Sequence, residues 1–158
     1  MQEMKYLIRE LMEQELEEAV RLIHTVFQQF VEKDYEEEGI CNFHKFTSYY
    51  HMREEYRNKG LLFFGAFQQE QIVGVVAIKE HQHICLLFVK EEYQNKGIAS
   101  ELIQKVIEIA KQNNQGVSKI TVNSSPYAKE FYHKSGFQDL DSLKIMDGIK
   151  FIPMKKDL

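Results

Sequence analysis

The segment from Ile84 to Gln112 limits the possible folds of this chain more than any other part of it. It reads ICLLFVKEEYQNKGIASELIQKVIEIAKQ, an apolar run, a short polar loop and an amphipathic pattern. The run Ile84 to Val89 is continuously apolar, which is typical of a strand covered on both faces. From Ile98 onward the apolar residues recur at helical spacing. The segment therefore predicts a buried strand that leads through a loop into a helix.

The loop before this helix has the properties of an anion site. The first backbone N–H groups of a helix have no partner inside it, and the helix dipole adds partial positive charge there. Gly97 lets the backbone bend and leaves no Cβ in the way of an anion. The pattern favours a pyrophosphate bound over Gln94 to Ser100. The alternative is an ordinary turn in which Gly97 only eases the bend.

Two sequence blocks resemble the GNAT superfamily of N-acetyltransferases. The loop matches the family pattern for the acetyl-CoA loop at Gln94, Gly97 and Ala99. The second block runs from Asn123 to Ala128 and continues in FYHKSGF, which ends at Phe137. Both blocks occur in the order found in the family. The resemblance is specific from about Leu87 to Phe137 and only topological outside that range.

The patterns along the chain indicate an α/β (α+β) fold in a single domain, residues 1–158. The expected strands and helices alternate in an order that starts with antiparallel neighbours and ends with one strand–helix–strand crossover. Strands are expected at 5–9, 61–67, 71–79, 84–89, 120–122 and 148–154, and helices at 13–31, 42–56, from 98 onward and after Pro126. The resemblance implies a mostly antiparallel sheet of six to seven strands with one splayed parallel pair, flanked by about four helices.

The same resemblance implies acetyl-CoA as cosubstrate and a set of residues that bind it. The pantetheine arm would lie between the splayed strands, and the pyrophosphate would lie on the loop. The expected binding residues are Leu87, Phe88, Val89, Gln94, Asn95, Lys96, Gly97, Ile98, Ala99, Ser100, Asn123, Ala128 and Tyr132. Asn123 could equally cap the helix that follows it.

Catalytic roles are expected at Tyr132 and Phe88. Tyr132 lies one helical turn after Ala128, and its phenol stays protonated at neutral pH, so it can donate a proton to the departing thiolate. The alternative is that Tyr132 is an amphipathic core residue. The backbone N–H near Phe88 is the candidate that polarises the acetyl carbonyl, unless all such groups are paired in the sheet.

The residue that deprotonates the acceptor amine is left open by the sequence. Glu80, His81 and His83 lie at one strand connection, and Glu36 to Glu38 form an acidic cluster. Each set could also be solvated, and the resemblance does not choose between them. Two histidines without a third ligand do not predict a metal site.

Composition excludes several classes of protein. The 158 residues carry a net charge of −4, which gives no basic face for nucleic acid. No apolar stretch is long enough for a membrane span or signal peptide. Cys41 and Cys85 have neither a zinc-type nor a redox-pair spacing, so a cytoplasmic protein with reduced thiols is expected. Cys85 is expected to be a small core residue and not a nucleophile.

The predicted function is transfer of an acetyl group from acetyl-CoA to a primary amine of a small molecule or peptide. Transfer would be direct, within a ternary complex. Two alternatives stay open: a noncatalytic acyl-CoA-binding module of the same fold, and an acetyltransferase that acts on protein N-termini or lysines. The resemblance also makes a homodimer possible.

Overall fold

A computed structural model of the chain describes residues 6–113 and 116–158. Within these residues the chain forms eight strands and five α-helices, with three short 3-10 turns between them. In chain order they are β1 (Leu7–Glu10), α1 (Leu16–Phe30), α2 (Glu37–Phe46), α3 (Tyr49–Arg57), β2 (Leu62–Gln68), β3 (Gln71–Lys79), β4 (His83–Val89), α4 (Ile98–Gln112), β5 (Lys119–Ser124), α5 (Lys129–Lys134), β6 (Gln138–Asp139), β7 (Lys144–Met146) and β8 (Ile149–Asp157).

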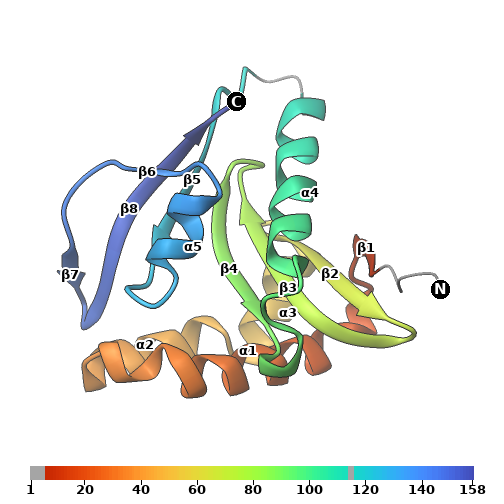
Figure 1. Ribbon diagram of the computed structural model, residues 1–158. Coiled ribbons are helices and arrows are strands. Elements are labelled where there is room, and N and C mark those ends of the chain that lie inside the picture. The colour runs from red at the N-terminus through yellow and green to blue at the C-terminus, as the bar shows by residue number, and fades with distance from the viewer. Residues whose placement is uncertain (1–5, 114–115) are drawn as a thin grey trace.

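The strands form one mixed sheet in the order β1-β2-β3-β4-β5-β8-β6, with β7 paired to β8 (Figure 1). Every described pair is antiparallel except β4–β5, as the sequence predicts. The predicted fold class is confirmed, but the strand and helix counts were too low. β6 and β7 were missed because two and three residues are too short to show a period.

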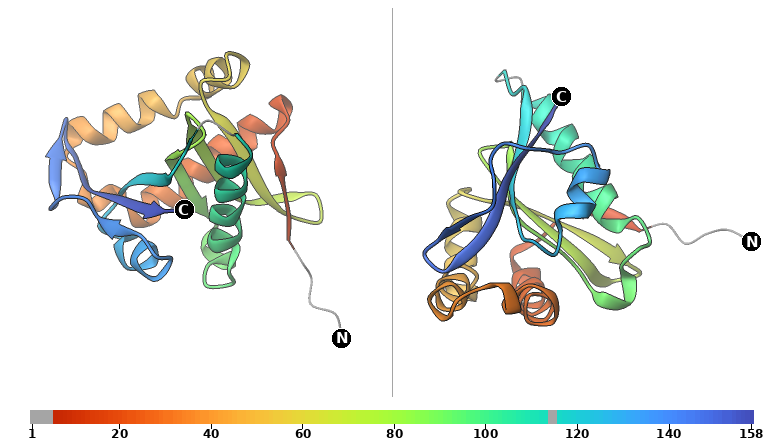
Figure 2. Two further views of the ribbon diagram at one scale, coloured as in Figure 1. Left: turned by 90° about the horizontal axis from the view of Figure 1, so that it is seen from above. Right: turned by 60° about the vertical axis from the view of Figure 1, so that its left-hand side comes forward.

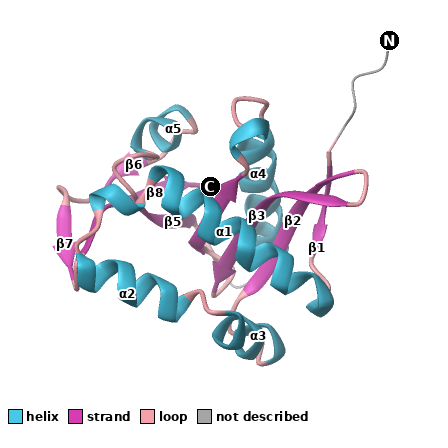
Figure 3. Ribbon diagram, turned by 90° about the horizontal axis from the view of Figure 1, so that it is seen from below, coloured by secondary structure: helices cyan, strands magenta, loops and turns pink. Residues whose placement is uncertain are grey.

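Helices cover both faces of the sheet, as Figure 2 shows from two sides. One apolar cluster joins α1, α2 and α3 to one face, and it includes Phe27, Phe43 and Met52. A second cluster joins α4 and α5 to the other face, and it includes Leu102 and Tyr132. Figure 3 shows α1 crossing in front of the sheet. Of the described helices, none combines the length and apolar character that crossing a membrane requires.

The parallel pair opens into a wedge because of a bulge at Cys85. β4 pairs with β5 only through His83 and Ile84. On its other edge, Ala77 of β3 pairs with Leu86 and the next residue, Ile78, pairs with Ile84, so Cys85 has no partner. A bulge bends its strand and increases the local twist. β4 therefore turns away from β5 just after their last pair, and the two strands diverge toward the bottom of Figure 1.

The helix predicted over 42–56 is wrong in its boundaries. The structure has two helices, and Ser48 begins the second by accepting a hydrogen bond at Oγ from the His51 N–H at 3.2 Å. Asn42, the expected N-cap, instead lies inside α2 and donates from Nδ2 to the carbonyl of Asp147 at 3.2 Å. α2 begins five residues earlier because Glu37–Gly39, expected in a loop, are helical.

The last helix also starts later than predicted. Pro126 was expected in its first turn, but residues 125–128 form a separate turn in which the Ala128 N–H donates to the Ser125 carbonyl at 3.1 Å. α5 begins at Lys129. The connection between β5 and α5 is therefore longer, and it carries Tyr127 toward the open end of the wedge.

Candidate active site

A cavity of about 520 Å³ lies in the wedge between β4 and β5. It reaches from the first turn of α4 to the last turn of α1. Its walls are Val26, Val31, Tyr35, Phe43, Ile84, Cys85, Leu86, Leu87, Phe88, Val89, Tyr93, Gln94, Asn95, Gly97, Ile98, Ala99, Ser100, Val122, Asn123, Ser125, Tyr127, Ala128, Phe131 and Tyr132. Of the predicted cofactor residues, all but Lys96 line it, and the exposed Lys96 lies within the same loop.

The cavity passes through the sheet from one face to the other. Leu87, Ala128 and Phe131 pack against the cluster of α4 and α5, whereas Tyr35 and Phe88 pack against the cluster of α1 to α3. We call the first part the donor half and the second part the acceptor half. Only an interrupted sheet permits such a passage, and the interruption is the splay that begins at Cys85.

The donor half contains the anion-binding geometry predicted from the sequence. Gly97 is the N-cap of α4 with φ of 85°, a left-handed conformation that glycine adopts without strain. The first helical hydrogen bond runs from the Glu101 N–H to the Gly97 carbonyl at 3.0 Å, so the amides of Ile98, Ala99 and Ser100 have no partner within the helix. A Cβ added at Gly97 would meet nothing within 4 Å. The loop is therefore open toward an anion.

The backbone of β4 presents Leu87 and Val89, and not Phe88, to the wedge. The Lys90 N–H donates to the Val73 carbonyl of β3 at 3.0 Å. Because alternate residues of a strand direct their N–H and C=O groups to the same edge, Phe88 faces Val75 of β3 and its neighbours face β5. The Val89 carbonyl accordingly accepts from Gln94 Nε2 at 3.0 Å. The free N–H expected near Phe88 therefore belongs to Leu87 or Val89.

Tyr132 lies in the donor half, within the apolar cluster of α4 and α5. Its side chain is 4% exposed and lines the cavity, and its N–H donates to the carbonyl of Ala128 at 3.1 Å. The ring packs edge-on against Phe131 and Phe137. Burial raises the pKa of the phenol well above its ordinary value. Within the described residues its hydroxyl has no hydrogen-bond partner, so it is a protonated donor that is not used by the fold.

Tyr127 is a site residue for which no role was expected from the sequence. Its hydroxyl donates to Gln94 Oε1 at 3.0 Å, and its ring stacks on Phe30 of α1 with centroids 4.9 Å apart. The side chain thus connects the β5–α5 turn to the cofactor loop and to the opposite layer. A tyrosine directly before the matched Ala128 was visible in the sequence, but contacts across 33 and 97 residues leave no local pattern.

Glu80 and His83 are not brought to the cavity. Glu80 is exposed in the β3–β4 turn with φ of 54°, at the end of the sheet where β4 and β5 still pair and the wedge is closed. His83 Nδ1 lies 2.7 Å from Thr121 Oγ1 of β5, where the two parallel strands still pair. Burial, followed by the nearby Lys79, lowers the pKa of His83. His83 joins β4 to β5 at the closed end of the wedge, and its position gives no support to a role as base.

Cys85 is not the enclosed core residue that the sequence predicts. The bulge turns its side chain into the acceptor half, where it is half-buried. Burial nevertheless raises the pKa of its thiol to about 11. A thiol with that pKa carries little thiolate at neutral pH, so it is a poor nucleophile.

Asn123 is exposed one residue before the end of β5, and it lines the cavity. Its register partner is Pro153 of β8, which has no N–H. Across residues 6–113 and 116–158, no three His, Cys, Asp or Glu side chains are grouped so that they could hold a metal ion.

The chain belongs to the GNAT acetyltransferase family. Residues 31–158 match the model of the acetyltransferase (GNAT) domain. Among curated relatives, it is 35% identical over 75 residues to the N-acetyltransferase YafP of Escherichia coli, which is 48% of this chain and 45% of that protein. It is 29% identical over 103 residues to the spermidine N(1)-acetyltransferase of Thermoplasma acidophilum, which is 63% of this chain and 62% of that protein. The chain thus spans less than two thirds of the length of either relative.

Solved structures show the same fold along the whole chain. A GCN5-related N-acetyltransferase of Rhodopseudomonas palustris superposes with a TM-score of 0.83 at 22% identity, over 100% of this chain and 99% of that one. The PaiA N-acetyltransferase of Thermoplasma acidophilum, in complex with coenzyme A, superposes with a TM-score of 0.79 at 24% identity, over 98% of this chain and 100% of that one. At these identities the comparison establishes the fold.

Proposed function

We propose that the protein transfers an acetyl group from acetyl-CoA to a primary amine by direct attack within a ternary complex. One observation carries the proposal. In a chain of the GNAT family, a single cavity joins the free amides of the α4 N-terminus to the free backbone edge of β4. A pyrophosphate and a peptide-like arm need these two kinds of group.

The donor half would hold the cosubstrate in an extended form. The amides of Ile98, Ala99 and Ser100 would bind the pyrophosphate with the help of the helix dipole. The amide groups of the pantetheine arm would pair with Leu87 and Val89 as a missing strand would, and Asn123 lines the other side. The thioester would then lie beside Tyr132, close to the acceptor half. A PaiA protein of this fold has been solved with coenzyme A.

The reaction then needs few side chains. The neutral amine attacks the acetyl carbonyl, a C–N bond forms, and the C–S bond breaks. The negative charge on the carbonyl oxygen is met by a backbone N–H of β4, from Leu87 or Val89. The sulfur leaves with the bonding electrons and accepts a hydrogen bond from Tyr132. The attacking nitrogen, which carries one proton too many after the C–N bond forms, gives that proton to water. Positioning within the wedge supplies much of the acceleration.

Tyr132 acts in this proposal mainly as a hydrogen-bond donor. A phenol with a raised pKa is a weaker acid than a thiol, so full proton transfer to the thiolate is uphill. A charged acceptor nevertheless strengthens the hydrogen bond that the phenol donates. The proposed acid role from the sequence is thereby narrowed to stabilisation of the leaving sulfur.

The experiment is a pair of measurements on the same preparation. Calorimetry tests whether coenzyme A binds, and release of free thiol from acetyl-CoA in the presence of primary amines tests transfer. Binding together with amine-dependent thiol release supports the proposal. Binding without turnover for any amine would favour the noncatalytic module, and absence of binding would remove the proposal as a whole.

The remaining expectations about partners are part of this proposal. The acceptor is a small-molecule or peptide amine, which agrees with the relative named for spermidine. Action on protein N-termini or lysines is the alternative, and turnover of a peptide in place of a free amine would favour it. A homodimer, a single domain and a cytoplasmic location stay predictions from the sequence.

A further inference from the structure

The acceptor half of the cavity has apolar and aromatic walls. Val26 and Val31 come from α1 and its C-cap, Phe43 from α2, and Cys85 and Phe88 from β4. Tyr35 adds a phenol on this side. None of the described residues that line the cavity, in either half, is Asp, Glu, His, Lys or Arg. A ligand in the acceptor half would therefore meet no opposite charge.

The aromatic wall is held rigidly. Phe43 stacks on the fully buried Phe27 with centroids 3.9 Å apart and planes 8° apart, and Phe27 also meets Tyr35 edge-on at 5.1 Å. Phe43 in turn faces Phe88 at 6.0 Å and 66°. A flat ring that entered this space would gain edge-to-face contacts without any rearrangement of the wall.

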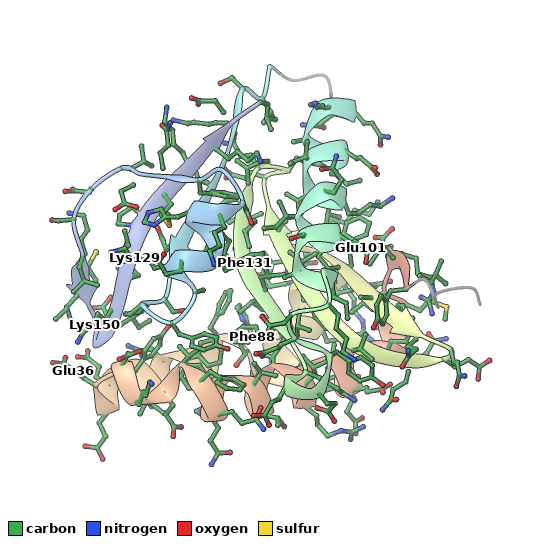
Figure 4. The ribbon with its side chains drawn as sticks, in the orientation of Figure 1. Glu36, Phe88, Glu101, Lys129, Phe131 and Lys150 are labelled. Carbon is green, nitrogen blue, oxygen red and sulfur yellow. The ribbon has the colours of Figure 1, made fainter. Side chains whose placement is uncertain are left out.

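The acidic residues that follow Tyr35 in the sequence do not supply a negative charge to the acceptor half. Glu36, Glu37 and Glu38 start α2 and are exposed, and none of them lines the cavity. The Glu36 N–H donates to the carbonyl of Gly148 at 2.9 Å, which places it beside the β7–β8 turn. Figure 4 shows Glu36 at the outer end of α2, away from Phe88 and Phe131 in the middle of the molecule.

We infer that the acceptor is an arylalkylamine, a primary amine on an uncharged aromatic body, and not a polyamine or an amino acid. This inference rests on the proposed function. A second ammonium or a carboxylate would be buried without a partner, and such a group costs several kcal/mol. An apolar site also favours the neutral form of an amine, which is the form that attacks.

The test compares three acceptors that share an amine and differ in added charge. Phenethylamine, phenylalanine and spermidine are offered with acetyl-CoA, and thiol release gives kcat/KM for each. We expect kcat/KM for phenethylamine to exceed that for phenylalanine and for spermidine by at least about 100-fold, because the latter two would bury one or more extra charges. Equal or higher kcat/KM for spermidine or phenylalanine would overturn the inference while leaving acetyl transfer intact. Coenzyme A binding with no thiol release from any amine would instead count against the proposed function.

A pair of variants tests the same point from the protein side. Tyr35→Asp places a carboxylate in the acceptor half just before α2, where negative charge suits the helix dipole. Tyr35→Asn is the control, because asparagine has nearly the same shape as aspartate but carries no charge. The Asp variant should raise the ratio of spermidine to phenethylamine kcat/KM at least 10-fold over the Asn variant. Equal ratios would contradict the inference, and if neither variant folds, the wild-type comparison alone decides it.

Discussion

The hydroxyl of Tyr127 donates a 3.0 Å hydrogen bond to Oε1 of Gln94, and this bond links the β5–α5 turn to the loop that follows β4. Gln94 uses its amide nitrogen at the same time to hold the Val89 carbonyl of β4. The stack of Tyr127 on Phe30 ties the bond to α1. Three layers therefore meet at one tyrosine, which is 45% exposed.

Removal of that hydroxyl should speed cofactor entry. A hydrogen bond of this type contributes about 0.5–1.5 kcal/mol net, so its loss in Tyr127→Phe should raise the association rate constant of coenzyme A about 2- to 10-fold. Stopped-flow fluorescence measures this rate. Tyr93→Phe is the control, because Tyr93 also lines the cavity but its hydroxyl has no described partner. An unchanged rate in Tyr127→Phe would show that the bond does not limit entry.

Gly97 offers a prediction with a matched control elsewhere in the chain. Gly97 and Gly116 both have positive φ, 85° and 72°, and a Cβ at either would meet nothing within 4 Å. Alanine at either position should destabilise the fold by about 1 kcal/mol through backbone strain. Only Gly97→Ala should also weaken coenzyme A binding, since its Cβ would take up space through which the pyrophosphate approaches the loop. Calorimetry and thermal unfolding together separate the two effects, and equal affinity in both variants would contradict the loop assignment.

The parts of the site that could be predicted from the sequence are those built from neighbouring residues. The loop from Gln94 to Ser100 follows its strand and precedes its helix directly, so spacing alone located the free amides. Ala128 and Tyr132 were placed on one face for the same reason. A turn, a cap and a helical period are all encoded within a few residues.

The parts that were missed depend on partners distant in the sequence. The bulge at Cys85 is defined by how β4 pairs with β3, a strand that the local sequence does not show. Because Cys85 has no partner in that pairing, the bulge decides which amides of β4 face the wedge. For that reason free backbone groups were expected around Leu87, Phe88 and Val89 alike, with the catalytic N–H near Phe88. The break at Thr47 was hidden because Thr and Ser also occur within helices; Thr47 Oγ1 donates to the Phe43 carbonyl at 2.8 Å and ends α2.

The thiol of Cys85 should not take part in transfer. With a pKa of about 11, against an ordinary value of 9.0, it carries about 100-fold less thiolate at neutral pH than an ordinary thiol. Cys85→Ala should therefore keep turnover within a few-fold of the wild type. Mass spectrometry after incubation with acetyl-CoA alone should detect no acetyl group on the cysteine. A stable acetyl adduct at Cys85, together with lost turnover in the variant, would indicate a covalent route.

His83 should make the fold sensitive to acid. Its folded-state pKa is lowered, chiefly by burial, so the unfolded chain binds the proton more readily. Above about pH 6.5 both states are neutral there and no effect is present; as pH falls below that value, stability is lost until the folded-state pKa is passed. The Tm of the wild type should thus fall on acidification. His24, whose pKa is also lowered by burial, adds to the same trend.

Two variants isolate the contribution of His83. His83→Asn removes the titration and should flatten the dependence of Tm on pH between 7 and 5, leaving the share of His24. Thr121→Val removes the 2.7 Å contact but keeps the buried imidazole, so its dependence on pH should stay close to that of the wild type. Identical slopes in the wild type and His83→Asn would mean that His83 does not titrate differently in the two states.

Tyr132→Phe should lower turnover and leave cofactor binding nearly unchanged. The ring keeps its contacts with Phe131 and Phe137, so the variant loses only the hydroxyl, which the fold does not use. A hydrogen bond to a charged sulfur contributes about 1.5–3 kcal/mol, which corresponds to a kcat about 10- to 100-fold lower. Steady-state kinetics should show this loss, while the Kd of coenzyme A stays within about 2-fold. Tyr93→Phe again supplies the matched control. A normal kcat in Tyr132→Phe would show that the departing sulfur does not depend on the hydrogen bond from Tyr132.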